Sequence, residues 1–299
     1  MLRRSRLKPA ASGNARTAQD EFGAIMSLHR FLFTVALKCA SRAVHLRDLL
    51  LGRIPRGQPS ADAAISRTQQ TIPSGRNLLD AVFVQPAGGA TRKSVLICHG
   101  IGEVVSQWYP IQRLFAVGGI ASLVFDYSGY GRSTGRIDWS QCEQDAIAAF
   151  ARLQDLSPGG PISVLGFSLG TGVAPAVLHR VAADRLVLCA GFTSFRDGAH
   201  SARIPRMFSA LVPPIWSAGE ALRNCSLPVL VVQGNGDRLF RMQMGRALCS
   251  QCGPQAELLI LPARSHNDPF YRPQMQYWGP IISWMLAVEP QSTNIPSQK

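Results

Sequence analysis

The 299-residue sequence is poor in acidic residues and in charge overall, with 18 Asp and Glu against 31 Lys and Arg and a charged fraction of only 16%. Hydrophobic residues make up 46% of the chain, which excludes a disordered or fibrous protein and allows a sizeable core. No helix-turn-helix, zinc-finger or RNP-type pattern accompanies the excess of basic residues. The sequence therefore argues against nucleic acid as a partner.

Most of the positive charge lies in residues 1–57, which hold eleven Lys or Arg and three acidic residues. Long apolar runs are missing from this part, since Phe31–Leu37 is far shorter than the ~18 residues that cross a bilayer. Its basic residues and the apolar residues Leu28, Leu32 and Val35 fall on different sides of a helical projection. The pattern predicts a basic amphipathic helix in an N-terminal extension over residues 1–57.

Three roles stay open for this extension: attachment to an anionic membrane surface, a transit peptide, or a helix that packs Leu28, Phe31, Leu32 and Val35 on the rest of the protein. Translation from Met26 would remove its most basic part. Residues 58–75 are rich in Ser, Gln and Thr, and we interpret them as a linker. Residues 290–299 are expected to form a disordered tail.

The seven cysteines are odd in number and scattered through apolar runs, as reduced core cysteines usually are. Cys249 and Cys252 have the C-x-x-C spacing, but no second pair accompanies them, so we expect a structural role and no metal site. These features favour a cytoplasmic protein, with peripheral attachment at the inner membrane surface left open.

Beyond residue 76, short apolar runs alternate with longer helix-compatible segments. Seven runs are predicted as strands: Ala81–Val84, Ser94–Cys98, Ala121–Phe125, Ile162–Leu165, Arg185–Cys189, Val229–Val232 and Glu257–Leu261. Several are apolar at consecutive positions, as expected for strands covered on both faces. The alternation predicts an α/β fold with a mostly parallel, doubly wound sheet over residues 76–289.

A candidate nucleophile follows the fourth of these runs. Ile162–Leu165 leads into Gly166-Phe167-Ser168-Leu169-Gly170, and a helix-compatible segment follows. In a strand–turn–helix context G-x-S-x-G forms a nucleophile elbow, in which the glycines allow a sharp turn and close packing. Upstream, His99-Gly100-Ile101-Gly102 also follows a predicted strand. We assign the two oxyanion-hole N–H groups to Ile101 and Leu169, with Gly102 as the alternative to Ile101 and His99 as a structural residue.

The segment Asp126-Tyr127-Ser128-Gly129-Tyr130-Gly131-Arg132-Ser133 resembles the D-Y-x-G-Y-G-x-S segment of ABHD-type esterases and thioesterases. Together with G-x-S-x-G it makes the chain similar to the α/β-hydrolase superfamily over about residues 76–289. The resemblance implies a sheet with a small helical lid, which we place at residues 194–225. Ile101 and Gln233 depart from the branch, which often has Asn at the first position and His at the second.

The chain order of this superfamily, nucleophile then acid then histidine, selects the other two members of a triad. His266 follows the last predicted strand, whereas His29, His45 and His99 precede the serine. Asp237 follows Val229–Val232 on a turn. Asp268 is a rival acid, but it lies too close to His266 along the chain to reach the far imidazole nitrogen easily.

Ser168, Asp237 and His266 predict a serine hydrolase that acts on an ester or thioester of an acyl or lipid-like substrate through an acyl-enzyme. This chemistry needs no cofactor and no metal. A peptidase, an amidase, a C–C bond hydrolase and a non-catalytic binding protein on the same fold stay open. Four aromatic residues are assigned to the substrate-binding surface: Trp108, Tyr130, Phe208 and Trp216.

Overall fold

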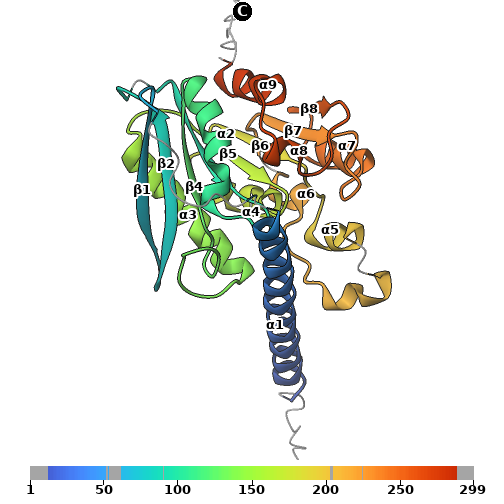
Figure 1. Ribbon diagram of the computed structural model, residues 1–299. Coiled ribbons are helices and arrows are strands. Elements are labelled where there is room, and N and C mark those ends of the chain that lie inside the picture. Colours follow the sequence, from blue (N-terminus) through green and yellow to red (C-terminus); the bar gives the residue numbers. More distant parts are fainter. Residues whose placement is uncertain are drawn as a thin grey trace, which may run out of the picture.

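A computed structural model describes residues 13–51, 53, 62–89, 91–202, 205–223 and 225–287, and its centre is an eight-stranded sheet (Figure 1). The strands are β1 (Ile65–Ser74), β2 (Asn77–Pro86), β3 (Lys93–Cys98), β4 (Ile120–Phe125), β5 (Ile162–Phe167), β6 (Arg185–Cys189), β7 (Val229–Gly234) and β8 (Ala256–Leu261). Their order in space is β1-β2-β4-β3-β5-β6-β7-β8. β3 to β8 are parallel, and β1 and β2 are antiparallel additions at one edge.

Helices cover both faces of the sheet. The larger ones after β2 are α2 (Val105–Val117), α3 (Trp139–Leu156), α4 (Gly170–Val177), α7 (Met242–Gln251) and α9 (Met275–Leu286). α3, α4 and α7 pack on one face, and α2 and α9 pack on the other. In β3, Leu96 and Cys98 point into the first layer while Val95 and Ile97 point into the second. Covered on both faces, the parallel strands need consecutive apolar residues, and the predicted doubly wound sheet is confirmed.

The linker predicted over residues 58–75 is wrong for residues 65–74, which form β1 and pair along their whole length with β2. β1 is an edge strand, and Ile65, Ile72 and Ser74 are its buried residues. Its other positions are polar, and the edge tolerates Pro73, so the sequence lacks the apolar signal of the inner strands. The catalytic domain accordingly begins at least ten residues earlier than the predicted boundary at residue 76.

The predicted lid region contains three short helices between β6 and β7: α5 (Phe195–Ser201), the 3-10 helix η2 (Arg206–Leu211) and α6 (Ala218–Ala221). The predicted tail at residues 290–299 lies outside the described residues. Four of the seven cysteines are buried as expected, and Cys225 and Cys249 are partly buried. Cys98, Cys142, Cys189 and Cys252 are buried, but Cys39 is exposed on a helix.

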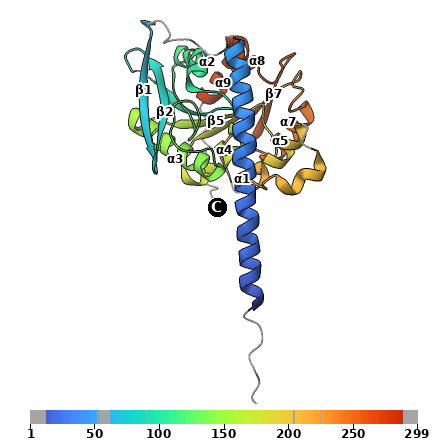
Figure 2. The ribbon, with the colours of Figure 1, turned by 60° about the horizontal axis from the view of Figure 1, so that its bottom comes forward.

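The N-terminal extension contains the predicted helix, α1 (Gly13–Leu50), whose C-terminal half packs against the rest of the protein (Figure 2). The packing hypothesis is wrong for two of the four residues that it named, and a third, Leu32, is partly buried. Phe31 and Val35 are exposed, whereas Leu37 is buried in the main core and Thr34 Oγ1 donates to the Ile137 carbonyl at 2.9 Å. The side chain of Leu28 lies outside the described residues. In the described part of the chain, no helix combines the length and the apolar character needed to cross a membrane.

Candidate active site

Ser168 occupies a strained turn between β5 and α4. Its φ is +50°, a left-handed conformation that non-glycine residues rarely adopt. The two flanking glycines are required by close packing, because a Cβ at Gly166 would lie 2.4 Å from the Gly170 carbonyl oxygen and one at Gly170 would lie 1.9 Å from the Cys98 carbonyl oxygen. Such strain persists where the surroundings enforce it, and it places the serine hydroxyl at the carboxyl edge of the sheet.

Three side chains from distant parts of the chain meet at this edge. His266, in the loop after β8, lies with Nε2 3.0 Å from Ser168 Oγ and Nδ1 2.8 Å from Asp237 Oδ2. Asp237 is buried in the loop after β7, and Ser168 is only 7% exposed. The arrangement orients the imidazole with Nδ1–H toward the carboxylate and leaves Nε2 to accept the serine proton.

The Asp237 carboxylate is fixed by its own loop. Oδ1 accepts hydrogen bonds from the backbone N–H groups of Leu239 (2.8 Å) and Phe240 (2.9 Å). Gln233 Nε2 donates to Oδ2 at 3.1 Å and to the Phe240 carbonyl at 2.6 Å. The residue that departs from the family pattern therefore holds the carboxylate and its loop. Asp268 faces elsewhere and accepts from the Ser265 N–H at 2.7 Å, so the structure brings only Asp237 to the imidazole.

The predicted oxyanion donors lie on the two segments expected to carry them. Ile101 belongs to the loop after β3, and Leu169 immediately precedes α4. Among the described residues, neither backbone N–H donates to another protein group. The N-terminus of α4 adds a partial positive charge near Leu169. Gly102, the alternative donor, has φ +75°, and a Cβ there would lie 2.5 Å from the Val44 Cβ of α1.

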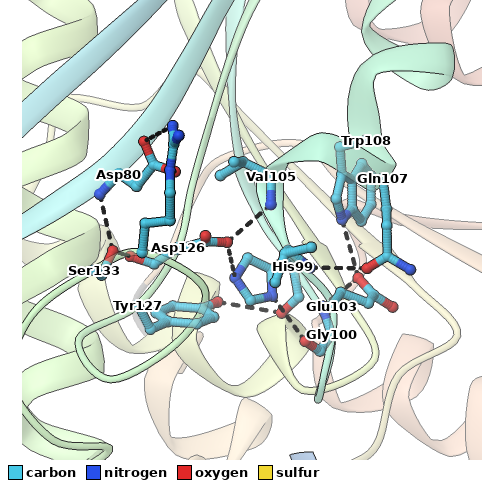
Figure 3. A network of polar contacts seen from close by, with 12 residues as sticks. Asp80, His99, Gly100, Glu103, Val105, Gln107, Trp108, Asp126, Tyr127 and Ser133 are labelled. Atoms are coloured by element: carbon cyan, nitrogen blue, oxygen red, sulfur yellow. Dashed lines mark hydrogen bonds and ion pairs between the residues drawn. The ribbon is translucent and has the colours of Figure 1, made fainter. Parts of the chain in front are cut away.

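The buried side chain of Glu103 holds the loop after β3, residues 99–104, which we call the candidate oxyanion loop (Figure 3). Glu103 Oε2 accepts from the Gly100 N–H at 2.8 Å and from Trp108 Nε1 at 3.0 Å. Burial is the largest influence and raises the pKa of Glu103 to about 8. The sequence analysis missed this residue. An acidic residue three positions after Gly100, in a chain with few acidic residues, was the available signal.

The pKa of Glu103 predicts a pH dependence of stability. Between about pH 5 and pH 8 the folded protein keeps a proton on Glu103 that the unfolded chain has lost, so the free energy of unfolding falls as pH rises, by at most ~1.4 kcal/mol per pH unit for this group. Glu103→Gln keeps an oxygen acceptor but removes the titration. Urea unfolding at several pH values should show a shallower decline in the variant. Equal slopes in both proteins would contradict the assignment to Glu103.

His99 and Asp126 form a second buried group beside the loop (Figure 3). His99 Nδ1 donates to the Gly100 carbonyl at 2.7 Å, and its ring packs against Tyr127 and Tyr130. Burial lowers the pKa of His99 to about 4 and raises that of Asp126 to about 8. His99 Nε2 lies 3.7 Å from Asp126 Oδ1, and both pKa shifts favour the neutral forms of these two side chains. The geometry agrees with a structural role for His99.

Asp48 of α1 connects this helix to α2 and α8 (Asp268–Tyr271), the helices that follow the loops of Ile101 and His266. This buried carboxylate accepts hydrogen bonds from Gln107 on α2 (3.3 Å) and from Tyr271 OH on α8 at 2.5 Å. Arg47 Nη2 also donates to Tyr271 OH at 2.9 Å. α1 is therefore part of the framework of the site, which the sequence did not indicate because its partners lie up to 223 residues away.

The four aromatic residues assigned to the substrate surface have different environments. Trp108 is fully buried between Phe167 and Phe270, and Trp216 is buried with Nε1 donating to Glu143 at 2.9 Å. Core packing accounts for the position of both rings, so their assignment to the substrate surface gains no support from the structure. Tyr130 is buried too, and it lines a cavity of about 270 Å³ between α1 and the candidate oxyanion loop. Phe208 is exposed on η2 of the lid.

Comparison with known proteins gives a consistent picture. The family model described as "Serine aminopeptidase, S33" matches residues 89–219. Lysophosphatidylserine lipase ABHD12 of Macaca fascicularis is 26% identical over 256 residues, covering 77% of this chain and 64% of the relative. The chain thus spans less than two thirds of the length of this relative. An uncharacterised protein of Mycobacterium tuberculosis is 27% identical over 224 residues, covering 71% of this chain and 79% of that protein.

Solved structures match over most of the chain. The hypothetical protein PA2218 of Pseudomonas aeruginosa aligns with a TM-score of 0.63 at 16% identity, over 77% of this chain and 98% of that one. The esterase Pf2001 of Pyrococcus furiosus aligns with a TM-score of 0.62 at 18% identity, over 78% of this chain and 96% of that one. At this level of identity the structural likeness establishes the fold, and the predicted fold class is confirmed.

Proposed function

Since the chain is an α/β-hydrolase that resembles the ABHD-type branch of that superfamily, we propose that it is a serine hydrolase that cleaves carboxylic esters or thioesters of acyl or lipid-like substrates. The observation that carries the proposal is the hydrogen-bonded series from Ser168 Oγ through His266 to Asp237, at 3.0 and 2.8 Å. The backbone N–H groups of Ile101 and Leu169, which donate to no other group among the described residues, complete the set that acyl transfer needs.

In the proposed reaction, Ser168 Oγ attacks the substrate carbonyl carbon while its proton passes to His266 Nε2. The N–H groups of Ile101 and Leu169 donate to the oxyanion, and Asp237 stabilises the imidazolium through Nδ1–H. Collapse of the tetrahedral intermediate breaks the ester or thioester bond, and His266 gives its proton to the leaving alcohol or thiol. Water, deprotonated by His266, then attacks the acyl-enzyme and releases the acid and the free serine.

The substrate class rests on the lid and on the relatives. η2 exposes Met207, Phe208 and Leu211, an apolar surface that suits an acyl chain better than a polar substrate. The ABHD12 relatives are named as lysophosphatidylserine lipases, and Pf2001 is named as an esterase. Both names support hydrolysis of an ester bond by this chain.

An aminopeptidase is the second candidate, because the matching family model carries that description. The same triad serves amide and ester hydrolysis, so the triad does not separate the two.

A substrate panel separates the candidates: p-nitrophenyl esters of increasing acyl length, an acyl thioester and an aminoacyl amide. We expect kcat/KM to be higher for the esters or the thioester than for the amide, and to rise with acyl length. A preference for the aminoacyl amide would favour the peptidase. No turnover of any substrate, together with no covalent labelling by a fluorophosphonate, would favour a non-catalytic binding protein.

A further inference from the structure

Helix α1 packs one side against the body of the protein, and the opposite side carries apolar residues that are mostly exposed. The inner side is the stripe of Thr34, Leu37, Ser41, Val44 and Asp48, whose 3-4-3-4 spacing keeps it against the body. The outer side is a second stripe, called here the outer face: Leu32, Val35, Cys39, Ala43, Leu46 and Leu50. At ~100° per residue the centres of the two stripes lie about half a turn apart.

Five of the six residues of the outer face are exposed, and Leu32 is partly buried. Val35 is 43% exposed, Leu46 is 56% exposed and Leu50 is 76% exposed. A helix on the surface of a soluble protein normally presents polar residues on this side. Six apolar or weakly polar positions in one stripe therefore indicate a surface that something else covers.

The exposed charges around the outer face have one sign. Between residues 27 and 51, Asp48 is the sole acidic residue, and it is buried. Lys38 and Arg42 flank the outer face on one side and Arg47 flanks it on the other, and all three are exposed. An apolar stripe between basic residues is the pattern of a helix that lies in the plane of an anionic lipid interface.

We propose that the outer face of α1 is a docking surface for an anionic lipid membrane. A lipid surface fits better than a second copy of the chain, because pairing two outer faces would bring like charges at Lys38 and Arg42 together. The proposal does not depend on the reaction that the site catalyses.

The test uses the full chain and cosedimentation with vesicles of phosphatidylcholine, with and without phosphatidylserine. The unaltered protein should bind the vesicles that contain phosphatidylserine, and binding should weaken as salt rises. Val35→Glu and Leu46→Glu should each lower the affinity about tenfold, because each places a charge where an apolar side chain is to be buried. Lys38→Gln and Arg42→Gln should each lower it about fivefold.

Val117→Glu is the matched control, because Val117 is 69% exposed at the end of α2 and does not belong to the outer face. It should leave vesicle binding unchanged, and thermal melting should show that all variants stay folded. Failure of the unaltered protein to bind vesicles would overturn the proposal, as would equal binding by Val35→Glu and Leu46→Glu. A dimer that Leu46→Glu converts to a monomer would instead identify the outer face as an interface between copies.

Discussion

Ser168→Ala should lower kcat for the best ester substrate by a factor on the order of 10⁶ and leave the fold intact. Without the hydroxyl no acyl-enzyme forms, and the oxyanion donors act alone on attack by water. The melting temperature should change little, because the substitution removes one oxygen atom from a buried but otherwise unaltered turn. Initial rates over a range of enzyme concentrations, together with thermal melting, measure both expectations.

A serine outside the triad provides the control. Ser106 lies on α2, and Ser106→Ala should keep full activity. If Ser168→Ala retained activity comparable to that of the control variant, another residue would have to be the nucleophile.

Asp237→Asn should lower kcat by about 10⁴, since the amide no longer selects the imidazole tautomer that leaves Nε2 free to accept the serine proton. The contacts with the Leu239 and Phe240 N–H groups should survive because an oxygen remains for them, whereas the amide nitrogen can no longer accept from Gln233 Nε2. Asp268→Asn should cost little, as that carboxylate binds the Ser265 N–H and not His266. Steady-state kinetics of both variants test the assignment. The reverse order of effects would move the acid to the histidine loop.

The three residues of the proposed triad could be predicted from local patterns in the sequence. Ser168 could be placed because its turn needs glycine at positions 166 and 170, and the structure shows the two close contacts that exclude a Cβ. Asp237 and His266 could be placed because each follows a strongly apolar strand, and the carboxyl ends of parallel strands meet at one edge. Here short-range patterns determine the position of a residue in space.

The features that the sequence did not predict depend on contacts between distant segments. β1 is recognisable as a strand through its pairing with β2, because its exposed residues are polar. The inner stripe of α1 includes a buried aspartate whose partners, Gln107 and Tyr271, lie in two different helices, α2 and α8. Trp108 lies within α2 and Trp216 lies between η2 and α6, and the packing that buries both side chains is a property of the assembled core.

At Gln233 the sequence showed a departure from the branch that the chain resembles. It did not indicate what the side chain does in the structure. The side chain replaces a common histidine and still reaches the acid of the triad, at 3.1 Å from Asp237 Oδ2. An amide in this position supplies a neutral donor that does not titrate near neutral pH.

The most direct test of the proposed function is peptide mapping after reaction with a fluorophosphonate. The account predicts one covalent adduct per chain, on the peptide that contains Ser168, and no adduct in the Ser168→Ala variant. An adduct on a different serine, or labelling that survives Ser168→Ala, would contradict it.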